Sequence, residues 1–288
     1  MKQWMNEPAF AYCADITRKR AGNFYRGIRL LPSLQRTAMF VVYAWMREAD
    51  DLVDAAPDVV KARGDLDAFA RQTAAVFDGQ LPSEHDGHLW TAMRHTCEAF
   101  GLVPGPFNAM LDGQRWDLDN RTVDTADDLH RYCEQVASSV GMVCVRIWGC
   151  TSDEAMELAR IRGLAFQLTN ILRDVGEDMH RGRCYLPVED IQGALSRDAL
   201  AAWHPPEACS GLILRWCEQA EAYYRASEGL DRMIPARCRP TLVAMTSVYR
   251  RILRQIAQRP ARSVLGPRAR LSTLCKVSLV ARAALVGR

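Results

Sequence analysis

Apolar residues recur every three or four positions along most of this sequence, whereas the alternating pattern typical of β-strands is rare. Proline and glycine fall mainly between the apolar stretches, where they favour loops. Because no Gly/Ser-rich linker and no repeat of fixed period divides the chain, we expect one all-α domain spanning residues 1–288. The pattern predicts helices near residues 7–20, 33–55, 61–78, 85–100, 125–149, 152–180, 207–230, 239–258 and 271–286.

Two of these helices start with the spacing of a capping box. Thr125 is followed by Asp128, and Thr151 by Glu154. In such a box, side chain and backbone satisfy each other's free hydrogen-bonding groups at the helix start. The spacing therefore predicts helices that begin beside Thr125 and Thr151.

A stripe of polar side chains follows the apolar run 38–46 on one predicted helix. Tyr43, Arg47, Asp50 and Asp54 are spaced i, i+4, i+7 and i+11, so all four lie on one helix face. The sequence thus places two acidic groups on an otherwise apolar helix.

A second stripe repeats this arrangement on the predicted helix 152–180. Gln167, Asn170, Asp174 and Asp178 are spaced i, i+3, i+7 and i+11, while most other positions around them are apolar. The two helices therefore carry one pair of aligned carboxylates each.

Aligned carboxylates on a mostly buried helix repel each other. At a separation of ~6 Å and an effective dielectric of ~20, this repulsion is roughly 3 kcal/mol per pair. Mg²⁺ removes the conflict, because it is usually held by one or two carboxylates together with substrate phosphates. We therefore expect a Mg²⁺ site, with Mn²⁺ as the alternative ion. The competing interpretation is a solvated surface on which Arg47 and Arg173 form ordinary salt bridges with these acids.

The residues around these stripes resemble the squalene/phytoene synthase family. The resemblance is strong over 167–178 (QLTNILRDVGED) and 181–187 (RGRCYLP), and over 24–32 (FYRGIRLLP), and weaker echoes extend it across residues 20 to 280. It implies an isoprenoid synthase fold, with helices around a central apolar cavity.

The resemblance also implies roles for individual residues. Aspartates would bind Mg²⁺ that bridges two diphosphates, namely Asp50, Asp51, Asp54, Asp174 and Asp178. Polar and cationic side chains would hold the diphosphates, namely Asn23, Arg47, Gln167, Asn170, Arg183 and Arg270. Asn23 lies where many relatives carry serine. Tyrosines would line the reacting centre, namely Tyr43, Tyr132, Tyr185 and Tyr249.

The implied reaction joins two allylic prenyl diphosphates head to head through a cyclopropylcarbinyl diphosphate. Two C20 chains would give phytoene, and two C15 chains would give presqualene diphosphate, squalene or dehydrosqualene; the sequence leaves this choice open. No G-x-G-x-x-G fingerprint for a dinucleotide is present, so NADPH is not expected in the first half-reaction. The alternative from another class is a non-catalytic relative that acts as an assembly or binding protein.

Composition limits the classes of protein to which this chain can belong. Hydrophobic residues make up 49% and charged residues 25% of the chain, which is typical of neither disordered nor membrane-spanning proteins. The ten cysteines form no C-x-x-C pair, so we expect reduced thiols. The N-terminal residues lack the apolar segment of a signal peptide, which favours a cytoplasmic protein.

Charge is distributed unevenly along the chain. From Arg232 to Arg288 there are thirteen Lys or Arg residues and no Asp or Glu. Such a basic end suits an anionic membrane surface or phosphate groups, and the alternative is a solvated basic face. We expect peripheral membrane contact near Arg250, Arg251 and Arg254. We do not expect nucleic-acid binding, because no recognised motif accompanies the charge.

Overall fold

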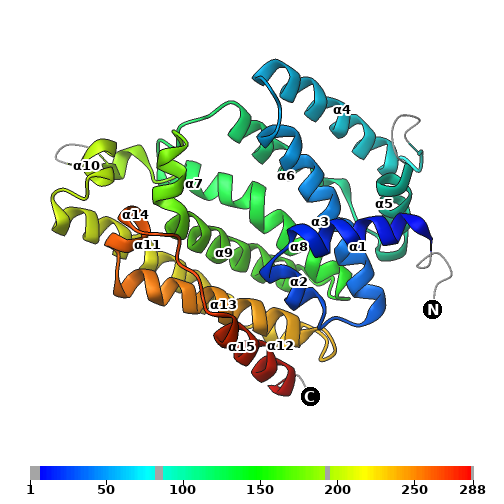
Figure 1. Cartoon of the computed structure of the whole chain (residues 1–288). Helices are drawn as coiled ribbons and strands as arrows, with labels where there is room; N and C mark the ends of the chain where they lie inside the picture. The colour runs from blue at the N-terminus through cyan, green and yellow to red at the C-terminus, as the bar shows by residue number, and fades with distance from the viewer. Residues whose placement is uncertain (1–6, 82–86, 192–194, 287–288) are drawn as a thin grey trace.

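The computed structural model describes residues 7–81, 87–191 and 195–286, and these contain helices but no β-strand. Figure 1 shows the helices in chain order. They are α1 (Pro8–Arg20), α2 (Asn23–Ile28), α3 (Ser33–Asp54), α4 (Val59–Phe77), α5 (Gly87–Phe100), α6 (Pro104–Leu118), α7 (Ala126–Cys133), η2 (Glu134–Ser138), α8 (Ser139–Ile147), α9 (Asp153–His180), η3 (Val188–Ile191), α10 (Arg197–Ala201), α11 (Pro206–Ala226), α12 (Leu230–Met233), α13 (Arg239–Gln258), α14 (Ala261–Leu265) and α15 (Thr273–Val286).

The expected all-α fold is confirmed, and most predicted helices lie within a few residues of the observed ones. The prediction was wrong between residues 101 and 124, where α6 was not foreseen. Pro104 and Pro106 suggested a loop, but proline is well tolerated in the first turn of a helix because the backbone N–H groups there have no intrahelical acceptor. The short helix α2 was also missed.

The predicted helix 125–149 consists of three consecutive segments, α7, η2 and α8. The middle segment η2 is a π-helical turn, in which the backbone bonds skip one residue more than in an α-helix. The capping box of Thr125 and Asp128 is confirmed. At the start of α9, the prediction was wrong by one residue. Ser152 caps this helix, since its side chain accepts a hydrogen bond from the Ala155 backbone N–H.

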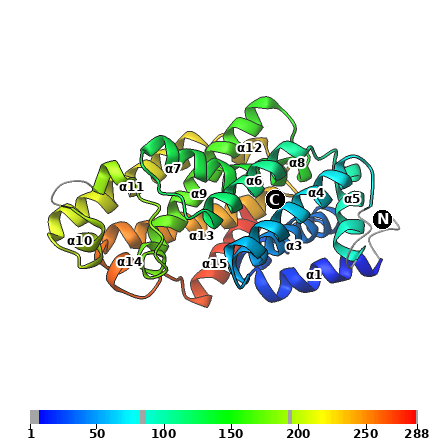
Figure 2. The ribbon, with the colours of Figure 1, turned by 90° about the horizontal axis from the view of Figure 1, so that it is seen from above.

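Helix α9 lies in the middle of the molecule in both views (Figure 1, Figure 2). It packs against α11 and α13 and against α8 and η2. Helices α1, α4 and α5 form one end of the molecule, and α10, α11 and α14 form the other. From this central position, α9 contributes side chains to both of the apolar clusters that fill the interior.

Two apolar clusters fill the interior. One centres on Trp45 and Phe107, and the other on Leu168, Leu172 and Tyr224. Helices α6, α9 and α13 contribute to both clusters, so they connect the two ends of the fold. The cysteines are all free thiols, as expected. No helix in the described part of the chain is long and apolar enough to cross a membrane.

Candidate active site

The first polar stripe lies at the C-terminal end of α3 and meets α6. Gln114 of α6 donates its side-chain N–H to Asp50 Oδ1 at 2.6 Å. The pKa of Asp50 is raised to about 7, chiefly by burial and also by the carboxylates of Asp54 and Asp117, against the opposing effects of Arg47 and Gln114. Asp50 is therefore a partly buried carboxyl group that lacks a full counter-charge.

Asp51 differs from Asp50 because two guanidinium groups hold it. Arg20 donates to both Asp51 oxygens at 2.9 and 2.8 Å, and Arg47 forms a further short ion pair. Burial alone would raise the pKa of Asp51, but these hydrogen bonds keep it below its usual value. The Nε atom of Arg47 is buried and has no hydrogen-bond partner, so this side chain retains one free donor.

The second stripe on α9 starts with a pair of amides. Asn170 donates its side-chain N–H to Gln167 Oε1 at 3.3 Å, while its own Oδ1 is buried without a partner. Asp174 follows one turn later and accepts two bonds of 2.7 Å from Arg173. Arg268, in the loop before α15, donates to the same carboxylate at 2.5 Å. Asp174 is thus neutralised by two arginines.

Asp178 is the more weakly compensated acid of the α9 stripe. Its pKa is raised to about 7, chiefly by burial and also by the nearby carboxylates of Asp174 and Glu177, against the opposing effects of Arg181 and Arg183. Arg183 lies close enough to lower the pKa of Asp178, and it also reaches Asp54 of α3 at 3.9 Å. One guanidinium group therefore interacts electrostatically with an acid of each stripe.

A further acid, Asp117 of α6, lies close enough to Asp54 and Arg183 for both to influence its pKa. Tyr185 donates its hydroxyl to Asp117 Oδ1 at 2.8 Å, and Tyr132 donates to Oδ2 at 3.1 Å. The two rings stack with centroids 4.8 Å apart. Burial raises the pKa of Asp117, although both hydroxyls and Arg183 oppose the increase.

Asp117 and Gln114 were not among the predicted site residues, because α6 had been taken for a loop. The i, i+3 spacing of these two residues would have placed them on one helix face if the two prolines had been recognised as a helix start.

The two remaining tyrosines lie at different depths. Tyr249 of α13 is buried, and its ring centroid lies 4.8 Å from that of Phe166. Burial raises the pKa of Tyr249, against nearby Arg173 and Asn170. Tyr43 of α3 is half-buried beside Arg47, and burial likewise raises its pKa.

Arg270 and Asn23 are the predicted residues with the fewest described contacts. Arg270 is exposed and forms no ion pair with a described residue, whereas Arg268, two residues earlier, contacts the site. The side chain of Asn23 lies outside the described part of the structure.

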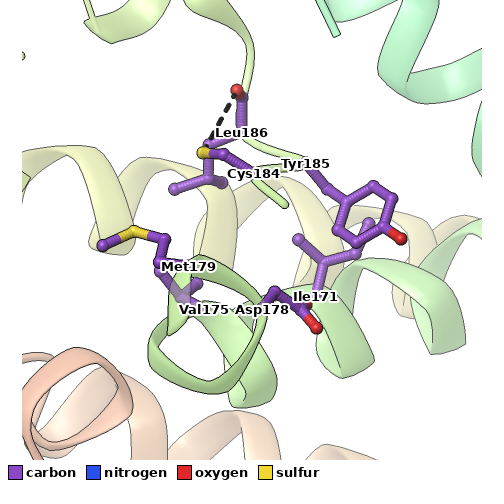
Figure 3. Close-up of a pocket in the computed structure, with 7 residues that line it drawn as sticks. All are labelled: Ile171, Val175, Asp178, Met179, Cys184, Tyr185 and Leu186. Carbon is purple, nitrogen blue, oxygen red and sulfur yellow. Dashed lines mark hydrogen bonds between the residues drawn. The ribbon is translucent and has the colours of Figure 1, made fainter. Parts of the chain in front are cut away.

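The recess beside Asp178 is small. It is lined by Ile171, Val175, Asp178, Met179, Cys184, Tyr185 and Leu186 (Figure 3). A second, apolar recess lies where α3, α6 and α8 meet, and its lining includes Trp45, Phe107 and Val143. Each of these two recesses has room for about one water molecule.

The carboxylates form pairs rather than a closed metal cage. Among the residues that the structure describes, no three His, Cys, Asp or Glu side chains converge as a preformed metal site would require. The donors still suit Mg²⁺, because Asp50 and Asp178 are incompletely neutralised carboxylates and Asn170 offers an unpaired oxygen. At Asp174, an arginine would have to give way to a metal ion.

Comparison with known proteins decides the family. The sequence profile described as squalene/phytoene synthase matches residues 17–275. The chain belongs to the squalene/phytoene synthase family. Phytoene synthase from Arthrospira platensis is 32% identical, over 97% of this chain and 94% of that protein. The 15-cis-phytoene synthase of a Synechocystis species is 36% identical, over 65% of this chain and 58% of the relative.

A solved structure agrees with this assignment. A dehydrosqualene synthase crystallised with a ligand superimposes with a TM-score of 0.82 at 30% identity, covering 96% of each chain. Members of the squalene/phytoene synthase family are prenyltransferases, so the expected enzyme class and isoprenoid synthase fold are both confirmed.

Proposed function

We propose that this enzyme joins two geranylgeranyl diphosphates head to head to form phytoene, and that it requires Mg²⁺. The observation that carries the proposal is that Arg183 lies 3.9 Å from Asp54 of α3 and also lowers the pKa of Asp178 of α9, so acids of both stripes share one guanidinium group. The names of the relatives support the C20 substrate, since phytoene synthases match nearly the whole chain.

Binding of the diphosphates would use the cationic groups of the site. Arg183 and the free Nε donor of Arg47 can each donate to phosphate oxygens. When bound, Mg²⁺ would neutralise the negative charge that develops on the leaving diphosphate. Asp50, Asp54 and Asp178 would hold it, together with Asp174 once an arginine has moved away.

The reaction then needs an acceptor for protons and an environment without water. Loss of the first diphosphate leaves an allylic cation, which the double bond of the second chain attacks. Release of one proton gives a cyclopropylcarbinyl diphosphate. A second ionisation, rearrangement and proton loss give the hydrocarbon. Tyr132 and Tyr249 are buried and Tyr185 is partly buried, and these three hydroxyl groups are the candidates to pass such protons to released diphosphate.

The tails would enter the apolar interior. The recess between α3, α6 and α8 lies on the inner side of the α3 stripe, and its lining residues Met46 and Met110 are flexible. Because this recess now has room for only about one water molecule, tail binding would displace side chains there.

A second candidate is condensation of two C15 farnesyl diphosphates, as in a dehydrosqualene synthase. The similarity to the solved dehydrosqualene synthase favours it. The active-site chemistry would be the same, and the depth of the tail pocket would decide between the two substrates.

Product analysis tests the proposal. The enzyme is incubated with geranylgeranyl or farnesyl diphosphate and Mg²⁺, with and without NADPH, and the lipid extract is analysed by mass spectrometry. We expect phytoene from the C20 substrate without NADPH, and no product with Asp50→Asn or Asp174→Asn. Exclusive turnover of the C15 substrate would refute the phytoene assignment, and full activity of either variant would refute the metal assignment.

A further inference from the structure

The loop between α14 and α15 covers one acid of the second stripe. Arg268, in the middle of this loop (266–272), donates to Asp174 Oδ2 at 2.5 Å. Arg173 donates to the same oxygen and to Oδ1, each at 2.7 Å. Because a carboxylate oxygen has two lone pairs, these two donors saturate Oδ2. A metal ion that binds this oxygen must therefore displace one of the two guanidinium groups.

Arg268 is the guanidinium group that is able to leave. Its side chain is 35% exposed, whereas that of Arg173 is only 13% exposed and makes two bonds to Asp174. Arg173 also lies beside the buried ring of Tyr249, whose pKa it lowers. Glu177 Oε2 lies 4.0 Å from Nη1 of Arg268, so a second carboxylate can accept this guanidinium group when it turns away from Asp174.

The backbone on both sides of Arg268 is held in place. Helix α14 packs on α9, where a Cβ atom at Gly176 would overlap the carbonyl oxygen of Val264 (Figure 1). Leu271, near the other end of the loop, is buried in the same apolar cluster as Val264. Because Gly176 follows Asp174 by two residues, these contacts keep the loop beside the acid. The exchange of partners therefore needs only rotation about side-chain bonds.

We propose that Arg268 controls metal binding at Asp174: it holds this carboxylate until a diphosphate arrives, and then turns away so that the carboxylate can bind the ion. This inference rests on the proposed function, since it takes Asp174 as a metal ligand. Phosphate oxygens attract a guanidinium group and are also ligands that Mg²⁺ prefers. Competition by Arg268 would therefore make binding of the ion at Asp174 depend on the diphosphate.

Binding of Mn²⁺ to the intact protein tests this competition without measuring activity. Mn²⁺ serves in place of Mg²⁺ because electron paramagnetic resonance detects the free ion. Without diphosphate, Arg268→Gln should bind Mn²⁺ about tenfold more tightly than the unmodified protein, a factor typical of one charge-assisted hydrogen bond. With inorganic diphosphate present, this gain should disappear, because Arg268 has then left Asp174 in the unmodified protein as well.

Two controls separate the release of Asp174 from a change in net charge. Arg181→Gln removes the same charge near the same stripe, but this side chain pairs with Glu177 at 3.0 Å. Its Mn²⁺ affinity should stay close to that of the unmodified protein. Arg268→Gln combined with Asp174→Asn should bind Mn²⁺ no more tightly than Asp174→Asn alone, because the carboxylate that Arg268 covers is gone. Melting temperatures show whether each variant is folded.

Three results would count against the proposal in different ways. Equal Mn²⁺ affinity of folded Arg268→Gln and the unmodified protein, with turnover retained, would refute the competition and leave the proposed reaction standing. An equal gain in Arg181→Gln would attribute the effect to net charge and would also refute the competition. Turnover that persists with a chelator, while no variant binds Mn²⁺, would refute the Mg²⁺ requirement of the proposed function itself.

Discussion

At the scale of single residues, the site depends on acids that share hydrogen bonds. Each carboxylate oxygen of Asp117 accepts one hydrogen bond, from the Tyr185 or the Tyr132 hydroxyl group. These two bonds hold the stacked tyrosine rings in place. Because Asp117 is partly buried and Tyr132 is buried, removing the carboxylate would leave the Tyr132 hydroxyl without its hydrogen bond, at a cost of about 1–3 kcal/mol. We therefore assign to Asp117 the positioning of the two tyrosines.

This assignment predicts coupling between Asp117 and Tyr185. In a double-mutant cycle with Asp117→Asn and Tyr185→Phe, the free energy of unfolding should show an interaction energy of about 1 kcal/mol. The amide can still accept one bond, whereas phenylalanine removes the donor altogether. Urea denaturation of the four proteins provides the measurement, and additivity within about 0.3 kcal/mol would contradict the coupling.

At the scale of elements, the π-helical turn η2 packs closely on α9. A Cβ atom at Gly163 would lie 2.5 Å from the Ser138 Cα and 2.7 Å from its backbone nitrogen. Glycine is therefore required at this crossing, although it is unfavourable inside a helix. The close contact holds η2 and the adjoining α7, which carries Tyr132, against the helix that bears the second stripe.

Gly163→Ala should therefore destabilise the fold by about 1–3 kcal/mol, because backbone atoms rather than a flexible side chain must move. A matched control is Gly211→Ala on α11, where no atom lies within 4 Å of the added Cβ. There, the higher helix propensity of alanine should stabilise by up to about 1 kcal/mol. Calorimetric melting would then shift in opposite directions for the two variants. A shift in the same direction would contradict the packing argument.

At the scale of the whole molecule, the fold brings together acidic groups from three helices. Asp50 lies on α3, Asp117 on α6 and Asp178 on α9, and burial raises the pKa of each. When all of these carboxylates are charged, their burial and mutual repulsion lower the free energy of unfolding. A bound cation would raise it again.

The stability of the metal-free enzyme should therefore depend on pH. Asp50 and Asp178 have folded-state pKa values of about 7, above the ordinary value of 3.8, so the folded state binds more protons than the unfolded state between these limits. Their contribution to stability falls as pH rises towards 7 and is constant above it. After allowance for solvent screening, we expect the pair to favour pH 6 over pH 8 by on the order of 1 kcal/mol.

Melting temperatures at both pH values measure this effect. In the double variant Asp50→Asn/Asp178→Asn, the difference in melting temperature between pH 6 and pH 8 should become smaller, because these two groups no longer titrate. Mg²⁺ should raise the melting temperature of the unmodified enzyme more at pH 8 than at pH 6. An identical pH profile for the double variant and the unmodified enzyme would contradict the assignment.

The sequence by itself determined the helical class, the limits of the long helices and the two acidic stripes. These features follow from local periodicity, because residues four apart on a helix share a face wherever the helix lies. The stripes Tyr43 to Asp54 and Gln167 to Asp178 are found on α3 and α9 as predicted.

Only the tertiary structure decided which side chains meet. Asp117 joined the site because α6 packs against α3 and places this carboxylate within hydrogen-bonding reach of Tyr185. Arg268 reached Asp174 from the loop before α15, although Arg270 had been expected to serve the site. Contacts between residues 94 positions apart have no local signature, since they depend on how the helices pack. The same packing decided that Arg250 is paired and that Leu274 faces solvent.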